Sequence, residues 1–103
     1  MFTHIGMLTL VESATDGDRA AIATGLTSLV GQIDGLVSAR VATDLGLTEG
    51  NADVLFLLEF ASEEAWRAYA VHPAHKAVIA SAIGPVLASK VFVQADGFAE
   101  ARA

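Results

Sequence analysis

Five consecutive apolar residues, Val54-Leu55-Phe56-Leu57-Leu58, constrain the fold of this chain more than any other segment. Neighbouring side chains of a β-strand point to opposite faces of the sheet, so a strand with one face in water alternates between apolar and polar residues. In this run, the residues that point to one face and those that point to the other are all apolar. The beginning of the chain is similar, with Leu8 and Leu10 on one face and Ile5 and Met7 on the other. The sequence therefore predicts a β-sheet that is covered on both faces.

Hydrophobic spacing in the rest of the chain predicts the other elements. A 3.6-residue period is carried by Ile22, Leu26, Leu29, Val30 and Ile33 and predicts a helix that ends at Asp34-Gly35. Ser62 suits the N-cap of a second helix, and Pro73 suits the first position of a third. The predicted strands are residues 2–11, 36–45, 54–60 and 90–96, and the predicted helices are residues 18–33, 63–71 and 73–83. This βαββαβ order predicts an α+β, ferredoxin-like fold, in which helices cover one face of a four-stranded antiparallel sheet.

The sheet face away from the helices predicts a second copy of the chain. A contiguous apolar face in water would exceed the few hundred Å² that are usual for a monomer. A two-fold axis makes such a face self-complementary. Since 103 residues match one domain, we expect a single domain over residues 1–103 and no fused second sheet. The expected assembly is a homodimer through the β-sheet face.

The composition excludes several kinds of chemistry and partner. The chain has no cysteine, which removes disulfides, thiolate catalysis and Cys-based metal sites. A net charge of −6 with six scattered Lys and Arg argues against nucleic acid, because phosphate binding needs a basic face. Apolar runs end well before the roughly 18 residues that cross a bilayer, and the first residues lack the basic segment of a signal peptide. We expect a cytoplasmic protein, without a membrane or nucleic-acid partner, that binds an apolar small molecule or another protein.

Several short motifs occur in the order found in one known family. They are His4, Asp44-Leu45-Gly46, Asn51-x-Asp53 before the apolar strand that ends at Phe60, Tyr69, His72-Pro73-Ala74-His75, and Pro85-x-x-x-Ser89 before the last strand. Together they resemble the stress-responsive A/B barrel (Dabb) family over nearly the whole chain, and the Tyr-x-x-His-Pro-x-His run is the most specific part. The resemblance implies a ferredoxin-like chain that pairs into a dimeric α+β barrel. That assembly agrees with the independent argument from the two apolar sheet faces.

The resemblance also implies a chemistry. Many Dabb members have no assigned reaction, but one is a cofactor-free plant polyketide cyclase that closes a linear polyketide by an intramolecular aldol step. Its catalytic Tyr and His correspond to Tyr69 and His75, and a His in its pocket corresponds to His4. A further pocket His falls at Val54, where this sequence departs, so the same substrate is not implied. From the resemblance we expect no cofactor and a carbonyl-bearing, polyketide-like substrate.

Each of these three residues also has a structural interpretation. His75 suits a general base, because an imidazole with a pKa of about 6.5 is matched to proton abstraction at neutral pH; otherwise it is held by a hydrogen bond at a helix start. Tyr69 suits a hydrogen-bond partner of His75 or of an enolate oxygen, or a core residue with a satisfied hydroxyl. His4 suits the orientation of a substrate, or a satisfied polar group in the core or an interface.

Four further residues are expected to shape the pocket as substrate-binding positions. Gly6 shares its strand parity with His4, so open space is predicted beside the imidazole. Trp66 is expected in the core or the pocket wall, and Val54 is the position where the sequence departs from the cyclase. His72 suits a cap of the helix that begins at Pro73 better than it suits chemistry.

A metal site is the weaker interpretation of the three histidines. His72 and His75 are three residues apart, and His4 would supply the third ligand of a zinc site. However, Pro73 constrains the backbone between them, and no acidic residue adjoins the pair to orient a ligand. We therefore expect no metal.

Three functions remain open from the sequence. The first is a cofactor-free cyclase, lyase or isomerase, with His75 as base, Tyr69 as its partner or oxyanion donor, and His4 orienting the substrate. The second is a module that binds an apolar ligand without turnover. The third is a structural, stress-associated dimer in which the histidines only support packing.

Overall fold

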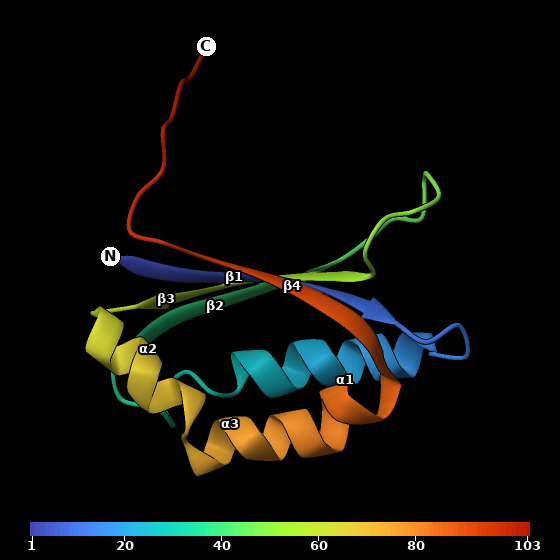
Figure 1. Ribbon diagram of the computed structural model, residues 1–103, viewed down its shortest axis with the longest axis horizontal. Helices are drawn as coiled ribbons and strands as arrows, with labels where there is room; N and C mark the ends of the chain where they lie inside the picture. The colour runs from blue at the N-terminus through green and yellow to red at the C-terminus, as the bar shows by residue number, and fades with distance from the viewer.

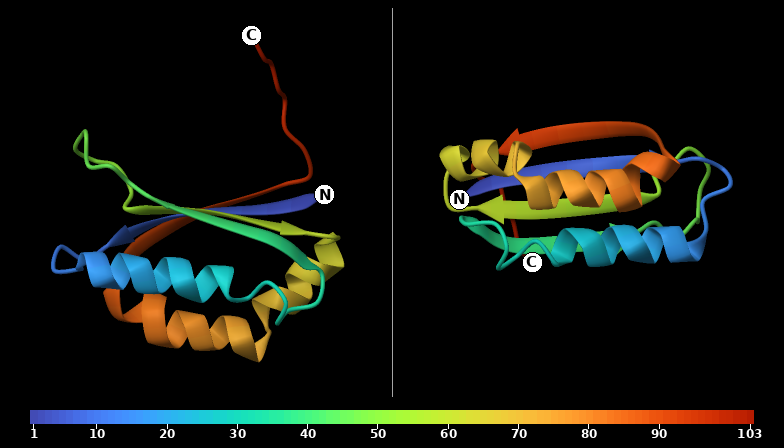
Figure 2. Two further views of the ribbon diagram at one scale, coloured as in Figure 1. Left: turned by 180° about the vertical axis from the view of Figure 1, so that it is seen from behind. Right: turned by 90° about the horizontal axis from the view of Figure 1, so that it is seen from below.

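The sheet of the computed structural model, which describes residues 1–103, has the strand order β2-β3-β1-β4. The strands are β1 (Phe2–Leu10), β2 (Leu36–Thr43), β3 (Val54–Phe60) and β4 (Leu87–Ala95), and every pair is antiparallel. Figure 1 labels the four strands, and the view from below in Figure 2 shows that β1 and β3, which have apolar residues on both faces, are the central ones. The predicted ferredoxin-like fold is confirmed. β4 starts three residues before its predicted beginning, and the other strand ends lie within two residues of prediction.

The helices all lie on one face of the sheet, as Figure 2 shows from behind and from below. They are α1 (Asp16–Thr27), α2 (Glu63–Ala70) and α3 (Pro73–Val78). Ser62 caps α2 by accepting a hydrogen bond from the Ala65 backbone N–H at 3.1 Å, and Pro73 is the first residue of α3. Both predicted helix starts are therefore confirmed. α3 continues as a π-helical turn (Ile79–Ile83) and a 3₁₀ turn (Gly84–Val86) before β4.

The end of α1 was wrongly predicted. The helix stops at Thr27 instead of continuing to residue 33, and Gly31 adopts a positive φ of 91° that an α-helix does not contain. Hydrogen-bonded turns follow the helix and keep the apolar side chains directed toward the core. In one of these turns the Ile33 N–H donates to the Leu29 carbonyl at 3.1 Å. Leu29 and Ile33 thus remain buried at 1% and 3% exposure. The spacing correctly predicted which side chains face the core, but not the backbone that carries them.

The core lies between the sheet and the helices. β3 alternates strictly, with Val54, Phe56, Leu58 and Phe60 buried on the helix side. The residues between them face away from the helices, on what we call the outer face of the sheet. There Met7 and Leu55 are 43% and 36% exposed. One of the two apolar faces is thus the core, and the other is open. None of the helices is long and apolar enough to cross a membrane.

Gly6 does not leave open space beside His4, which corrects the prediction from strand parity. A Cβ built on Gly6 would lie 2.1 Å from Cζ of Phe56, on the neighbouring strand β3. The ring of Phe56 therefore occupies the volume that the missing side chain vacates. Gly6 is required for the close approach of this ring to the β1 backbone.

We predict that Gly6→Ala destabilises the fold by about 1–3 kcal/mol, because the new methyl group overpacks the core. Urea unfolding measures this change. Phe56→Leu added to Gly6→Ala should recover part of the loss, since it removes the clashing ring atoms. Gly97→Ala is the control, because its Cβ would meet nothing within 4 Å. An unchanged unfolding midpoint in Gly6→Ala would contradict the packing of Phe56 on Gly6.

Candidate active site between the sheet and the helices

A cavity of about 280 Å³ lies on the helix side of the sheet and contains the predicted site residues. His4 enters it from β1, Tyr69 from α2 and His75 from α3. Most of the remaining wall is apolar or aromatic, and it includes Phe56, Trp66, Ile79, Ile83, Leu87 and Phe92. The fold thus brings His4, Tyr69 and His75 together around one apolar space. We call it the inner cavity.

His4 is held by a partner that the sequence did not predict. Its Nδ1 lies 2.9 Å from Nε2 of Gln94, which is opposite His4 in the β1–β4 register. An amide nitrogen can only donate a hydrogen bond, so Nδ1 of His4 must accept. The neutral ring then carries its proton on Nε2. Gln94 therefore makes His4 a hydrogen-bond donor through Nε2.

The surroundings of His4 favour its neutral form. Four aromatic rings enclose the imidazole, with centroids at 5.0 Å for Phe92, 5.3 Å for Phe56, 5.9 Å for Trp66 and 6.3 Å for Tyr69. Burial among them lowers the pKa of His4 to about 4, and nearby His75 adds to the shift. His4 is therefore uncharged at neutral pH.

The rings of Tyr69 and His75 lie against each other at a tilt, without the hydrogen bond that was one of the two roles expected for Tyr69. Their ring centroids are 4.1 Å apart and the planes are inclined by 31°. Burial raises the pKa of Tyr69, so its hydroxyl stays protonated and can donate. Burial lowers the pKa of His75, although the carbonyls of Ala70 and Tyr69 oppose part of this shift. A neutral imidazole can accept a proton, and a protonated phenol can donate a hydrogen bond.

Nδ1 of His75 has no hydrogen-bond partner, and it is the one buried side-chain nitrogen or oxygen in this condition. An unpaired buried polar atom costs about 1–3 kcal/mol. Nδ1 therefore does not supply the hydrogen bond that the structural interpretation of His75 expects, although the carbonyls of Ala70 and Tyr69 interact with the ring. At this position His75 contributes less to the free energy of unfolding than an apolar residue, or a residue with a hydrogen-bonded side chain, would contribute.

The other predicted positions are divided between the cavity and the fold. Trp66 lies in the cavity wall and stacks on Phe2 at 5.2 Å. His72 lies outside the wall, and its Nδ1 accepts the Ala74 N–H at 3.0 Å, so it caps α3. Val54 is 2% exposed and does not border the inner cavity. No group of three or more His, Asp or Glu has a geometry that would hold a metal ion.

Strand β4 supplies the wall residues that sequence reasoning missed. Lys90, Phe92 and Gln94 line the cavity from alternate positions, while Val91 and Val93 lie on the outer face. This alternation was visible in the sequence, because polar and aromatic residues interleave with valines. By itself, such alternation predicts a strand but not which face of the sheet each set of residues occupies. The side to which each residue points depended on the unknown register with β1.

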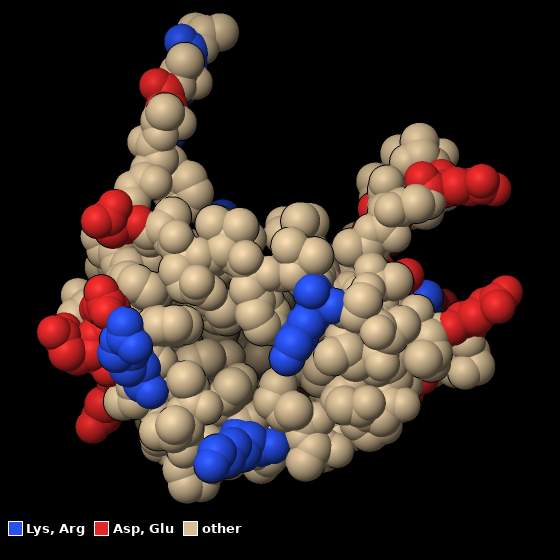
Figure 3. All heavy atoms as spheres, in the orientation of Figure 1, with Lys and Arg blue, Asp and Glu red and all other residues tan.

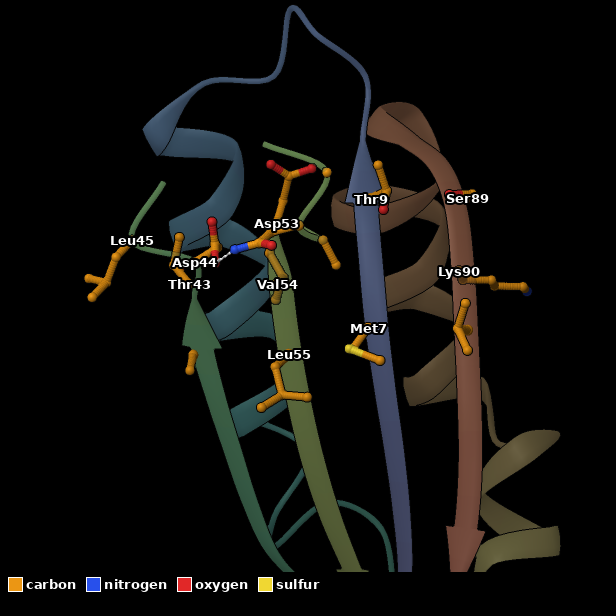
Figure 4. Close-up of a pocket in the computed structure, with 15 residues that line it drawn as sticks. Met7, Thr9, Thr43, Asp44, Leu45, Asp53, Val54, Leu55, Ser89 and Lys90 are labelled. Carbon is orange, nitrogen blue, oxygen red and sulfur yellow. Dashed lines mark hydrogen bonds between the residues drawn. The ribbon is translucent and has the colours of Figure 1, made fainter. Parts of the chain in front are cut away.

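A second and larger hollow, of about 670 Å³, lies on the outer face (Figure 4). Met7 and Leu55 lie over the centre of the sheet, next to the loop formed by residues 44–53. No His or Tyr lines it. Its acidic residues are already engaged: Asp53 accepts the Leu10 N–H at 2.7 Å, and Asp44 accepts from the Asn51 amide at 3.2 Å. The titratable groups with altered pKa values all belong to the inner cavity.

Residues 2–95 match the family model of the stress-responsive A/B barrel domain, Dabb. The chain belongs to this family. Among curated proteins, no sequence matches the chain. The motifs from His4 to Ser89 that resembled the family all lie within the matched range.

Solved structures of related proteins have the same fold. A dimeric ferredoxin-like protein of unknown function from Thermobifida fusca is 33% identical, with a TM-score of 0.79 over 90% of this chain and 87% of that one. An Arabidopsis thaliana protein is 19% identical, with a TM-score of 0.81 over 99% and 100%. A hydroxynitrile lyase from Passiflora edulis is 14% identical, with a TM-score of 0.76 over 95% and 96%. The last two are similar in fold alone. This Dabb fold therefore occurs both in an enzyme and in a dimer without known activity.

We predict that His4 titrates with a midpoint near pH 4 and carries its neutral-state proton on Nε2. An unfolded chain binds this proton near the ordinary pKa of 6.5, whereas the folded chain binds it only near 4. Between these values the free energy of unfolding should therefore fall as the pH falls, by at most about 1.4 kcal/mol per pH unit for this one group. Nitrogen-15 NMR of the imidazoles measures both the midpoint and the tautomer. His4→Gln should weaken the pH dependence of stability, and a midpoint between 6 and 7 would contradict the burial argument.

Proposed function

We propose that this Dabb protein acts on a small, largely apolar carbonyl compound in the inner cavity, without a cofactor. The observation that carries the proposal is the contact between the Tyr69 and His75 rings, which puts a neutral base beside a protonated donor in an apolar wall. His4 contributes a second donor, Nε2–H, whose tautomer Gln94 fixes. The cavity thus combines one base with two donors.

The proposed reaction begins at the carbon next to the carbonyl. A ring nitrogen of His75 takes a proton from that carbon, and the electron pair of the broken C–H bond moves to the carbonyl oxygen. Tyr69 and His4 donate hydrogen bonds to this developing enolate oxygen. The enolate then attacks a second carbonyl of the same molecule, as in a cyclisation, or takes a proton back. The proton held by His75 returns to the product.

The resemblance to plant olivetolic acid cyclase supports this class of reaction. In this resemblance, which rests mainly on the Tyr-x-x-His-Pro-x-His run, Tyr69 and His75 correspond to that enzyme's catalytic residues and His4 corresponds to a pocket position. The fold is also that of a Passiflora edulis hydroxynitrile lyase, so it can carry an enzyme's active site. Val54, which occupies the place of a pocket His and lies in the core, indicates a different substrate.

We predict that the protein accelerates exchange of the methyl protons of acetophenone with solvent deuterium. This probe is a neutral aryl ketone and needs no knowledge of the natural substrate. His75→Gln should reduce the exchange rate by about 10²-fold or more, the usual contribution of a general base. Tyr69→Phe should reduce it by about 10-fold or more, because one donor to the enolate oxygen is lost. Proton NMR of the methyl signal measures the exchange.

His72→Asn is the matched control, because it changes a nearby histidine outside the cavity and keeps a side chain that caps helices. It should exchange at the wild-type rate. Melting temperatures of all variants should be close to wild type. If acetophenone raises the melting temperature but does not exchange, the chain is a binding module. If His75→Gln unfolds the protein, the histidine is structural.

We also propose that the functional unit is a homodimer formed through the outer face. The dimeric Thermobifida fusca relative supports a dimer. Val91 and Val93 on this face are 59% and 52% exposed. The 44–53 loop and the segment after β4 both project on this side of the sheet (Figure 1), and Leu45, two residues after the end of β2, is 83% exposed. The sheet of a second copy, bound between the loop and the segment after β4, would cover apolar groups on the loop, on that segment and on the outer face.

We predict that Val93→Glu converts the dimer to a monomer at micromolar concentration, because the interface would have to bury an unpaired carboxylate. Sedimentation velocity measures this change. Val71→Glu is the control, since Val71 follows α2 and is 66% exposed on another part of the surface. It should remain dimeric. A Val93→Glu protein that still sediments as a dimer would place the interface elsewhere.

A further inference from the structure

Lys90 is the one residue in the inner cavity wall that carries a full charge at neutral pH. The wall contains no Asp or Glu, and burial keeps both of its histidines neutral. Lys90 is opposite Leu8 in the β1–β4 register, so it leaves the strand on the core side of the sheet. The only charge available to a bound molecule is therefore positive.

The ammonium group lies at the mouth of the cavity. Its Nζ is 5.3 Å from the centroid of the Phe92 ring, which is itself a wall residue and 42% exposed. Lys90 borders both hollows, and its side chain extends off the β4 edge (Figure 4). The ammonium thus lies where a ligand would pass from solvent into the apolar space.

Lys90 has no carboxylate partner, although acidic residues outnumber basic ones twelve to six. The ion pairs of the chain use only Arg19, Arg67 and Arg102. Figure 3 shows the face that carries β4, α2 and α3, where Lys and Arg lie over these elements while Asp and Glu gather toward the two ends. An unpaired cation at an apolar opening attracts anions locally, in spite of the negative net charge.

We propose that the ligand of the inner cavity carries a carboxylate, which Lys90 binds at the mouth while the carbonyl end reaches Tyr69 and His75. This inference rests on the proposed function and names its ligand class. A charge-assisted hydrogen bond beside an aromatic wall is stronger than the same bond in open solvent. A single ammonium, with no other cation in the wall, balances the single charge of a carboxylate, whereas a phosphate monoester carries about −1.5 to −2 at neutral pH. The field of Lys90 also contributes to the lowered pKa of His75, as expected for groups that share one cavity.

The size of the cavity restricts the ligand further. Its volume of about 280 Å³ is near the lower limit of small-molecule pockets. The expected class is a small acid with a carbonyl group several bonds from its carboxylate, on a short aromatic or aliphatic body.

The test compares 4-benzoylbutanoate, an aryl ketone that ends in a carboxylate, with its primary amide, which has nearly the same shape and no charge. Isothermal titration calorimetry measures both affinities in wild type, Lys90→Gln, Lys90→Arg and Lys76→Gln. Wild type should bind the acid about three- to tenfold more tightly than the amide, the size of a partly exposed ion pair. Lys90→Gln should abolish this preference without changing the affinity for the amide. Lys90→Arg should keep it, and so should Lys76→Gln, since Lys76 lies on α3 outside the wall.

The outcomes separate this inference from the proposed function. Equal affinities for acid and amide in wild type, or a preference that survives in Lys90→Gln, would overturn the role of Lys90 while the pocket stands. Binding of neither compound would overturn the pocket and this inference with it. The preference should also weaken as salt is raised, because the ammonium is partly exposed.

Discussion

Side-chain alternation along the two central strands determines the position of almost everything else in this molecule. In β1, His4, Gly6 and Leu8 point toward the helices, while Ile5 and Met7 point to the outer face. The same strand thus contributes to the core, to the inner cavity and to the face that we assign to the dimer. A register slip of one residue would exchange all of these roles. The pairing of β1 with β3 and β4 is the constraint on which the site depends.

The inner cavity exists because the core is interrupted at a few identifiable places. His4 occupies a core position on β1 but keeps a polar group there, and its cost is offset by the hydrogen bond from Gln94. On the helix side, the π-helical turn places Ile79 and Ile83 in the wall. Such turns are frequent near functional sites. The buried His4, the π-helical turn and the unpaired Nδ1 of His75 each reduce the stability of the core, and all three lie around one cavity. Such a grouping is typical of a functional site.

Much of the fold followed from the sequence, because hydrophobic spacing reports directly which side chains are buried. The spacing predicted the order of strands and helices along the chain, and the preferences of cap residues predicted the helix starts at Ser62 and Pro73 and the cap at His72. Hydrophobic spacing gave a wrong prediction where the burial pattern continues beyond the helix. This happens at the end of α1, where Leu29 and Ile33 stay buried outside the helix.

The contents of the cavity were harder to predict, because they depend on contacts between distant segments. Strand parity correctly put Gly6 next to His4, but only the structure shows that Phe56 from β3 fills the space. The spacing of Tyr69 and His75 indicated that they would meet, but not that their rings would stack. Gln94 is ninety residues from His4 in the chain, so no local pattern pairs them. Tertiary pairing decides such contacts.

Strand β4 connects the proposed chemistry to the proposed assembly. It is an edge strand that pairs only with β1, and its successive residues alternate between the inner cavity and the outer face. Gln94 on its inner side fixes the tautomer of His4, while Val91 and Val93 on its outer side are exposed in the single chain. A partner sheet that covers these valines would hold β4 from outside and so restrict the motion of the residues that line the cavity. In this arrangement the dimer would do more than bury an apolar surface, because it would order the one wall of the cavity that the core does not hold in place.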